Sequence, residues 1–185
     1  MRVISGKLKG RVLRSFKGQR IRPTTDRVKE SVFNIISAHL EGARVLDLFC
    51  GTGNLSIEAI SWGAQSCVAV DNHRDSINLT KANIEDLEIK RYVKVIQQDV
   101  KTYLAKYIAE PFDVIFADPP FTEKMADDVM TWLSKSQCYG PNTIIVIESS
   151  SRETIQDEYS DLKCVDRRTY GDKLASFFSK KESAK

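Results

Sequence analysis

Short apolar runs typical of buried strands alternate with helical patterns along most of this 185-residue chain. The strand-like runs lie at 44–49, 67–71, 93–97, 113–117 and 143–148, and helical patterns lie between them near 54–62, 73–87, 100–108 and 123–135. Strands that are each followed by a helix pair in parallel, with helices covering both faces of the sheet. The alternation therefore predicts an α/β fold with a doubly wound, mostly parallel, Rossmann-like sheet.

One more amphipathic helix is expected before the first strand, at 25–40. Apolar residues recur there at helical spacing, at Val28, Val32, Ile35, Ile36 and Leu40. The preceding Arg22-Pro23-Thr24-Thr25-Asp26 has the proline and polar side chains typical of a turn that starts a helix.

Both ends of the chain depart from the alternation. Residues 162–169 and 174–178 are strand-like and flank Tyr170-Gly171-Asp172-Lys173, which predicts a closing antiparallel hairpin. Near the start, residues 2–16 carry β-type side chains on either side of Lys7-Leu8-Lys9-Gly10. This pattern predicts a small N-terminal β-hairpin extension.

Length and composition fit one globular domain with a sizeable core. We expect an N-terminal arm at 1–22, the main domain at 23–180 and a frayed tail at 181–185. No run approaches 18 uninterrupted apolar residues, so the sequence predicts no membrane span. The N-terminus lacks the apolar stretch of a signal peptide, which predicts a cytoplasmic protein. Four scattered cysteines and two histidines have no metal-ligand spacing, so no metal site is expected.

Positive charge is concentrated at the start of the chain. Residues 1–30 hold ten Lys or Arg and two acidic residues, a net charge of +8, whereas the whole chain carries +3. Neutralisation of phosphates is the part of nucleic-acid affinity that does not depend on base sequence, so this arm favours a polyanionic partner. A solvated tail without function is the alternative. The candidate RNA-binding residues are Arg2, Lys7, Lys9, Arg11, Arg22 and Arg27.

A glycine-rich turn follows the first strand of the predicted sheet. The apolar run around Asp47 leads through Phe49 into Gly51-Thr52-Gly53, and Asn54 can cap the next helix. Two glycines permit a tight turn and a close approach of the backbone to a ligand. Such a turn alone is a weak signal, and Ser56 stands where the dinucleotide fingerprint has its third glycine, which disfavours NAD.

Polar side chains follow each of the first three strands. Asp71 and Asn72 end the second strand, where a carboxylate can accept hydrogen bonds from ribose hydroxyls. Asp99 ends the third and could meet an adenine amine, and Asp47 could hold an ammonium group directly or through water. Each aspartate alone could equally cap the following helix. Because ligands of such sheets bind outside the carboxyl ends of strands, three together favour a ligand site.

Asp118-Pro119-Pro120-Phe121 ends the fourth strand and predicts a catalytic loop. An exocyclic aromatic amine is a poor nucleophile because its lone pair is delocalised into the ring. The Asp118 carboxylate and the Pro119 carbonyl could accept its two hydrogens, which favours a pyramidal nitrogen and stabilises the developing positive charge. The two prolines hold these acceptors in place, and Phe121 could stack on the base. The alternative is a Pro-Pro turn with Phe121 in the core.

We call the glycine-rich segment from Asp47 to Gly53 the cradle. Together, the cradle and the catalytic loop indicate methylation of an amino group with S-adenosylmethionine as the cofactor. The chain resembles the bacterial RsmD-type family of methyltransferases, which modify the N2 amine of a guanine in 16S ribosomal RNA. The resemblance covers nearly the whole length and is carried by residues 2–11, residues 22–34, the Asp47 to Gly53 cradle and Asp118 to Phe121. The segment 22–34 is the most specific to this family.

The resemblance implies the seven-stranded sheet of class I methyltransferases, with a small hairpin that helps to hold RNA. It implies a small-subunit assembly intermediate carrying ribosomal proteins as the substrate, and we expect the protein to act as a monomer. It assigns catalysis to Asp118 through Phe121. Asp47, Gly51, Gly53, Asp71 and, less securely, Asp99 match cofactor positions.

Other readings of the sequence remain. A DNA adenine-N6 or protein glutamine methyltransferase would use a similar cradle and loop, but normally adds a recognition domain that 185 residues can hardly contain. An RNA-binding protein without enzymatic activity would account for the basic arm alone, and an NAD enzyme for the cradle alone. The favoured prediction is an RNA methyltransferase that draws its target base out of the stack.

Overall fold

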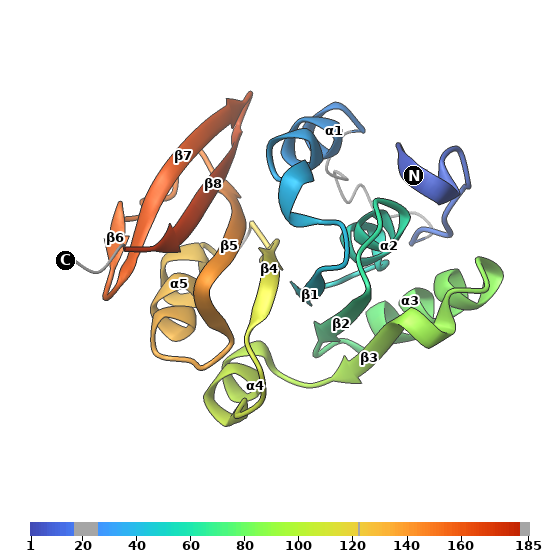
Figure 1. The fold of residues 1–185 in the computed structure, drawn as a ribbon. Helices are drawn as coiled ribbons and strands as arrows, with labels where there is room; N and C mark the ends of the chain where they lie inside the picture. The colour runs from blue at the N-terminus through green and yellow to red at the C-terminus, as the bar shows by residue number, and fades with distance from the viewer. Residues whose placement is uncertain (17–25, 122, 182–185) are drawn as a thin grey trace.

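The computed structural model describes residues 1–16, 26–121 and 123–181, and Figure 1 shows its fold. One mixed sheet of eight strands in the order β3-β2-β1-β4-β5-β8-β7-β6 runs through this part of the chain. Its parallel part consists of β1 (Arg44–Leu48), β2 (Ser66–Asp71), β3 (Val93–Gln97), β4 (Phe112–Ala117) and β5 (Tyr139–Ser150). The order reverses at β1, which has β2 on one side and β4 on the other, so the doubly wound prediction is confirmed.

The closing hairpin is also present and extends the sheet beyond β5. Strand β8 (Lys173–Lys180) pairs antiparallel with β5 and with β7 (Leu162–Tyr170). The eighth strand, β6 (Glu158–Tyr159), adds two residues at the edge, too few to produce an alternating pattern in the sequence. Strand β5 begins four residues before its predicted start, because Gly140 and Pro141 lie in the strand beside a register shift in β4.

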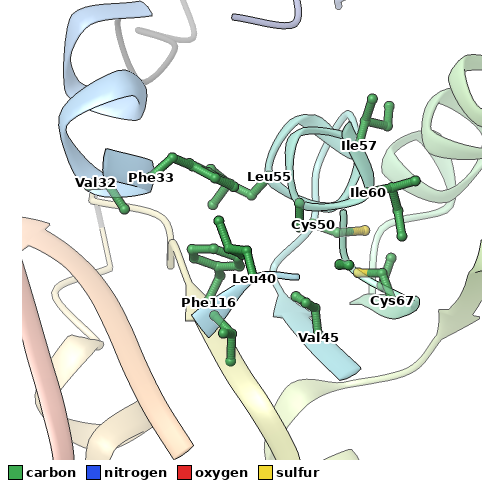
Figure 2. Packing of buried hydrophobic residues seen from close by; sticks show 14 of the residues in the cluster. Val32, Phe33, Leu40, Val45, Cys50, Leu55, Ile57, Ile60, Cys67 and Phe116 are labelled. Carbon is green, nitrogen blue, oxygen red and sulfur yellow. The ribbon is translucent and has the colours of Figure 1, made fainter. Parts of the chain in front are cut away.

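Within the described ranges, five α-helices cover the two faces of the sheet. Buried side chains of α1 (Asp26–Ile35), α2 (Asn54–Ser61) and α3 (Arg74–Asp86) form one core with one face. Those of α4 (Val100–Lys106) and α5 (Ala126–Ser134) form a second core with the opposite face. In the first core, shown in Figure 2, the ring of Phe33 from α1 stacks on that of Phe116 from β4, with centroids 5.2 Å apart. Helix α1 is therefore packed against the strand that leads into Asp118.

The predicted helix at 25–40 divides into two parts. Helix α1 ends at Ile35, and a 3-10 turn follows at Ser37–His39. The Ser37 hydroxyl donates a hydrogen bond to the Asn34 carbonyl (2.9 Å), and such side-chain bonds compete with the helical ladder. Ile35, expected on the apolar face, is 40% exposed.

The N-terminal arm forms a narrow antiparallel loop with one bridge, between Arg2 and Val12, and a 3-10 turn at Gly6–Leu8. Its backbone bonds to α2 as well as to itself, since the Leu8 amide donates to Ser61 Oγ (2.9 Å). Gly6 lies so close to α2 that a Cβ there would meet the Ser61 carbonyl oxygen at 1.8 Å. Residues 1–16 are therefore packed on the domain. The predicted boundary at 22/23 and residues 182–185 lie outside the described residues.

Candidate active site

The cradle and the Asp118 loop leave the sheet side by side. Strands β1 and β4 are parallel neighbours, with Leu48 registered against Ala117. The Asp118 amide donates to the Leu48 carbonyl across this pair (3.4 Å). The topology thus brings together two segments that are 70 residues apart in the sequence, at the carboxyl edge where α/β sheets bind ligands.

The backbone of the cradle requires glycine at one position in particular. Gly51 and Gly53 have positive φ angles of 55° and 77°. A Cβ at Gly53 would also lie 2.9 Å from Thr80 Cγ2, so any side chain there would force the Thr80 side chain of α3 to shift. Phe49 is left-handed as well, with φ of 63°, which is costly for an aromatic residue and is found mostly at functional sites.

Helix α3 fixes the carbonyl groups of the cradle. The Thr80 hydroxyl donates to the Gly51 carbonyl (2.9 Å), and the Asn83 amide donates to the Thr52 carbonyl (2.8 Å). These two bonds from α3 fix the backbone conformation of the turn. Sequence analysis predicted a helix at 73–87 but assigned no role to Thr80 or Asn83, because their contacts with the cradle join residues about 30 positions apart.

Asp47 is buried near the end of β1 and has one oxygen available. Its Oδ2 accepts from the Ser56 amide (3.0 Å) and from the Ser56 hydroxyl, whereas its Oδ1 is buried without a hydrogen-bond partner among the described residues. Burial raises the pKa of Asp47 to about 7, although the bonds from Ser56 oppose the rise. A buried carboxylate with a free oxygen is stabilised by a cationic group placed beside it.

Asp71, at the end of β2, is hydrogen-bonded to the backbone of the cradle. Its two oxygens accept from the backbone amides of Gly51 (3.0 Å) and His73 (2.9 Å). Each carboxylate oxygen has a second acceptor position, so these bonds leave capacity for hydroxyl donors. The adjacent Asn72 is exposed and its carbonyl accepts from the Gln97 side chain (3.4 Å).

Asp99 has the helix-capping role that the sequence left open. It is exposed, and its Oδ1 accepts from the amide and hydroxyl of Thr102 at the start of α4, both at 2.8 Å. The segment still lies beside the site, because the Gln98 amide donates to the Asp71 carbonyl (3.0 Å). A contact between Asp99 and an adenine stays a prediction.

The catalytic loop places Asp118 half-buried, Pro119 buried and Pro120 exposed. Burial and, next, the negative charge of Glu148 raise the pKa of Asp118, while the Lys173 ammonium lowers it. The negative charge of Asp47 also raises the pKa of Asp118. The loop therefore presents a carboxyl whose protonation depends on its neighbours.

Phe121 is half-buried, with the Lys173 ammonium 4.4 Å from its ring centroid. Lys173 in turn pairs with Glu148 on β5, at 3.1 Å between Nζ and Oε2. Sequence reasoning missed both residues, because Lys173 read as part of a turn and Glu148 as the end of an apolar strand.

A buried ion pair joins the arm, α1 and α2. Lys29 Nζ lies 2.7 Å from Glu58 Oε2 and donates to the Arg2 carbonyl (2.8 Å) and to Asn54 Oδ1 (2.6 Å). Glu58 also accepts from the backbone amides of Ile4 and Ser5. Burial lowers the pKa of Lys29, while the charge of Glu58 raises it. This lysine, counted in the sequence as part of the basic arm, is therefore structural.

The candidate RNA-binding residues differ in their surroundings. Lys7 and Lys9 are exposed and, within the described part of the chain, have no ion-pair partner. Arg2 is paired with Asp26 (2.9 Å), and Arg11 donates to the Asp86 carbonyl (3.1 Å). Arg27 is exposed on α1, and Arg22 lies outside the described residues.

Known proteins resemble this chain over nearly its whole length. A family model described as Conserved hypothetical protein 95 matches residues 1–179. YlbH of Bacillus subtilis is 38% identical over 173 residues, which cover 92% of this chain and 94% of that protein. The Ribosomal RNA small subunit methyltransferase D of Buchnera aphidicola (Acyrthosiphon pisum) is 34% identical over 154 residues, covering 83% and 80%. The chain belongs to this RsmD-like family.

A solved structure has the same fold as this chain. The protein described as methyltransferase yhhF of Escherichia coli superposes with a TM-score of 0.86 at 25% identity, covering 98% of each chain. This likeness confirms the class I methyltransferase sheet. The methyltransferase family to which the chain belongs uses S-adenosylmethionine as its cofactor. No helix within the described ranges is long and apolar enough to cross a membrane.

The residues present fit the cofactor of the RsmD-like family. The buried free oxygen of Asp47 suits an ammonium group, and the remaining acceptor positions of Asp71 suit ribose hydroxyls. The negative charge of Asp71, at the end of the neighbouring strand, adds to the rise in the pKa of Asp47, so this edge of the sheet favours a ligand that carries positive charge. The individual contacts stay predictions.

Proposed function

We propose that this protein transfers a methyl group from S-adenosylmethionine to the exocyclic N2 amine of a guanine in the 16S RNA of the small ribosomal subunit. The observation that carries the proposal is the pairing of β1 with β4, which sets the amine-acceptor loop beside the cofactor cradle. The Buchnera relative is itself named as a small-subunit ribosomal RNA methyltransferase. The packed, basic N-terminal arm supports an RNA substrate.

The chain's own residues account for the chemistry by positioning. When bound, S-adenosylmethionine would supply an electrophilic methyl group, and the electron pair of the broken S–CH3 bond would stay on the sulfur of the departing S-adenosylhomocysteine. The Asp118 carboxylate and the Pro119 carbonyl accept the two hydrogens of the target amine and so direct its lone pair toward that methyl group. Asp118, whose pKa is raised by burial and by Glu148, can then take the proton that the methylated nitrogen releases. Phe121 stacks on the base after it has left the RNA stack.

We further propose that the substrate is 16S RNA within small-subunit assembly intermediates, with ribosomal proteins contributing to recognition. The enzyme would act as a monomer in the cytoplasm. Lys7, Lys9, Arg11 and Arg27 are exposed around the arm and α1 and would contact phosphates without reading base sequence. Arg2 would do so only by releasing Asp26. Lys29 is excluded from this surface because it is buried against Glu58.

Methyl transfer to several acceptors tests the proposal. Labelled S-adenosylmethionine is incubated with unmodified small subunits, naked 16S RNA, DNA and ribosomal protein. Label in subunits or 16S RNA alone supports an RNA methyltransferase. Label in DNA or protein would replace it with an adenine-N6 or glutamine methyltransferase. Failure to bind S-adenosylmethionine at all would remove the methyltransferase assignment.

The double substitution Lys7→Ala with Lys9→Ala is expected to weaken RNA binding equally for all sequences. Each lysine that contacts a phosphate adds about 0.7 to 0.9 to the slope of log affinity against log salt. The slope should therefore fall by about 1.5 in the double variant. Fluorescence anisotropy with 16S fragments over a salt series measures this. Lys106→Ala with Lys135→Ala, exposed at α4 and α5, is the matched control, and an equal loss in both variants would count against the arm.

Phe121→Leu is expected to lower kcat/KM by about 10- to 100-fold, because stacking of a base on an aromatic ring contributes roughly 1–3 kcal/mol. Phe121→Tyr keeps a ring of similar size and should retain most activity. Single-turnover methylation of small subunits separates the two variants. Equal activity of the leucine variant and the wild type would show that the base does not stack on Phe121.

A further inference from the structure

The lysine over Phe121 is buried, and burial of an ammonium group is costly unless it is paired. The side chains of Lys173 and Glu148 are only 9% and 5% exposed, and their charged atoms are 3.1 Å apart. The same ammonium lies 4.4 Å from the centroid of the Phe121 ring. One ion pair therefore contacts the residue expected to receive the target base.

The sheet explains why this pair lies at the catalytic loop. Ala117 of β4 is registered against Ile147 of β5, so Asp118 and Glu148 are the next residues along two parallel neighbours. Lys173 begins β8, on the other side of β5, where it is registered against Ser150. The ion pair thus links β5 to β8 beside the strand that leads into Asp118, and Figure 1 shows β5 between β4 and β8.

We propose that Lys173 and Glu148 are positioning residues for methyl transfer: Lys173 fixes the Phe121 ring, and the two together set the charge of Asp118. The inference rests on the proposed amine methylation and assigns it two residues outside the Asp118 to Phe121 loop. A cation over one face of an aromatic ring is held by about 0.5–2 kcal/mol. In this arrangement the base would stack on the opposite face of the ring.

The charges around Asp118 oppose one another. Glu148 from β5 and Asp47 from β1 raise the pKa of Asp118, as does burial, whereas Lys173 from β8 lowers it. The ionised carboxylate of Asp118 is the stronger hydrogen-bond acceptor and the form that can take a proton from the amine, so activity falls as the pH falls through the pKa of Asp118. Loss of the lysine charge raises that pKa, and loss of the glutamate charge lowers it.

Two substitutions should therefore move the acid limb of the pH–rate profile in opposite directions. Lys173→Met shifts it to higher pH and Glu148→Gln to lower pH, each by about one pH unit or more. Lys173→Arg keeps the cation and should restore the wild-type limb. Lys180→Met is the matched control, because Lys180 lies on the same strand, pairs with Asp161 (3.1 Å) and lies over the Tyr139 ring (5.9 Å), away from the site.

Titration of the Asp118 carboxyl by ¹³C NMR in the free protein gives a readout that does not depend on activity. Opposite displacements of its pKa in the two variants support the inference, even if the RNA substrate proved to be wrong. Equal displacements, or none, would overturn it although the wild type methylates RNA. The double variant Lys173→Met with Glu148→Gln removes both charges of the pair and so leaves no unpaired buried charge. If Lys173→Met melts at a lower temperature than the double variant, a loss of activity in Lys173→Met reflects unfolding.

Discussion

Asp118→Ala is expected to lower the rate of methyl transfer by about 10³-fold, because it removes an electrostatic acceptor that acts mainly in the transition state. Asp118→Asn should fall between this variant and the wild type, since the amide oxygen still accepts one hydrogen bond but carries no charge. Binding of S-adenosylmethionine should change little, because the cradle that follows β1 is untouched.

Single-turnover kinetics on small subunits and calorimetric binding of the cofactor measure the two effects separately. Asp128→Ala, which removes an exposed carboxylate of α5, is the matched control and should behave as the wild type. An Asp118→Ala enzyme with a nearly normal rate would mean that the loop only shapes the pocket. Loss of cofactor binding in this variant would mean that Asp118 belongs to the cradle.

Lys29→Met is expected to lower the free energy of unfolding by about 3–5 kcal/mol. The substitution leaves the buried Glu58 carboxylate without its counter-charge and removes the donor to the Arg2 carbonyl and to Asn54. Asn54 begins α2 directly after Gly53, so the same change also loosens the cradle. A decrease in cofactor affinity should accompany the loss of stability.

Urea unfolding compares this variant with Arg14→Met, which breaks the exposed pair of Arg14 and Asp86. Exposed pairs contribute roughly 0–1 kcal/mol, so the control should remain close to the wild type. Equal effects of the two substitutions would contradict a structural role of the buried pair. Partial recovery is expected in Lys29→Met with Glu58→Gln, where the unpaired charge is gone.

The sequence predicted the parts of the fold that depend on local pattern. The five parallel strands and the closing hairpin follow from apolar runs and turn residues, and the neighbouring positions of the cradle and the Asp118 loop follow from the doubly wound order. These predictions hold because a strand buried on both faces must be apolar along its length.

Interactions between distant charged residues were not predictable in this way. In α1, Lys29 is 1% exposed and Ile35 is 40% exposed, the reverse of what their side chains suggest. Lys29 is buried because it pairs with Glu58 across the interface with α2, and this contact has no signature in the local sequence. The ion pair of Lys173 and Glu148 was not predicted from the sequence for the same reason, because the pairing of β5 with β8 brings the two residues together.

Analysis of the nucleosides released from methylated small subunits is the most direct test of guanine-N2 methylation in 16S RNA. Unmodified subunits are incubated with the wild-type enzyme and labelled S-adenosylmethionine, the 16S RNA is digested, and the labelled nucleoside is identified by mass spectrometry. Methylation of the guanine N2 amine should place all of the label in N2-methylguanosine. Label in a methylated adenosine, or in no nucleoside while the cofactor binds, would contradict it.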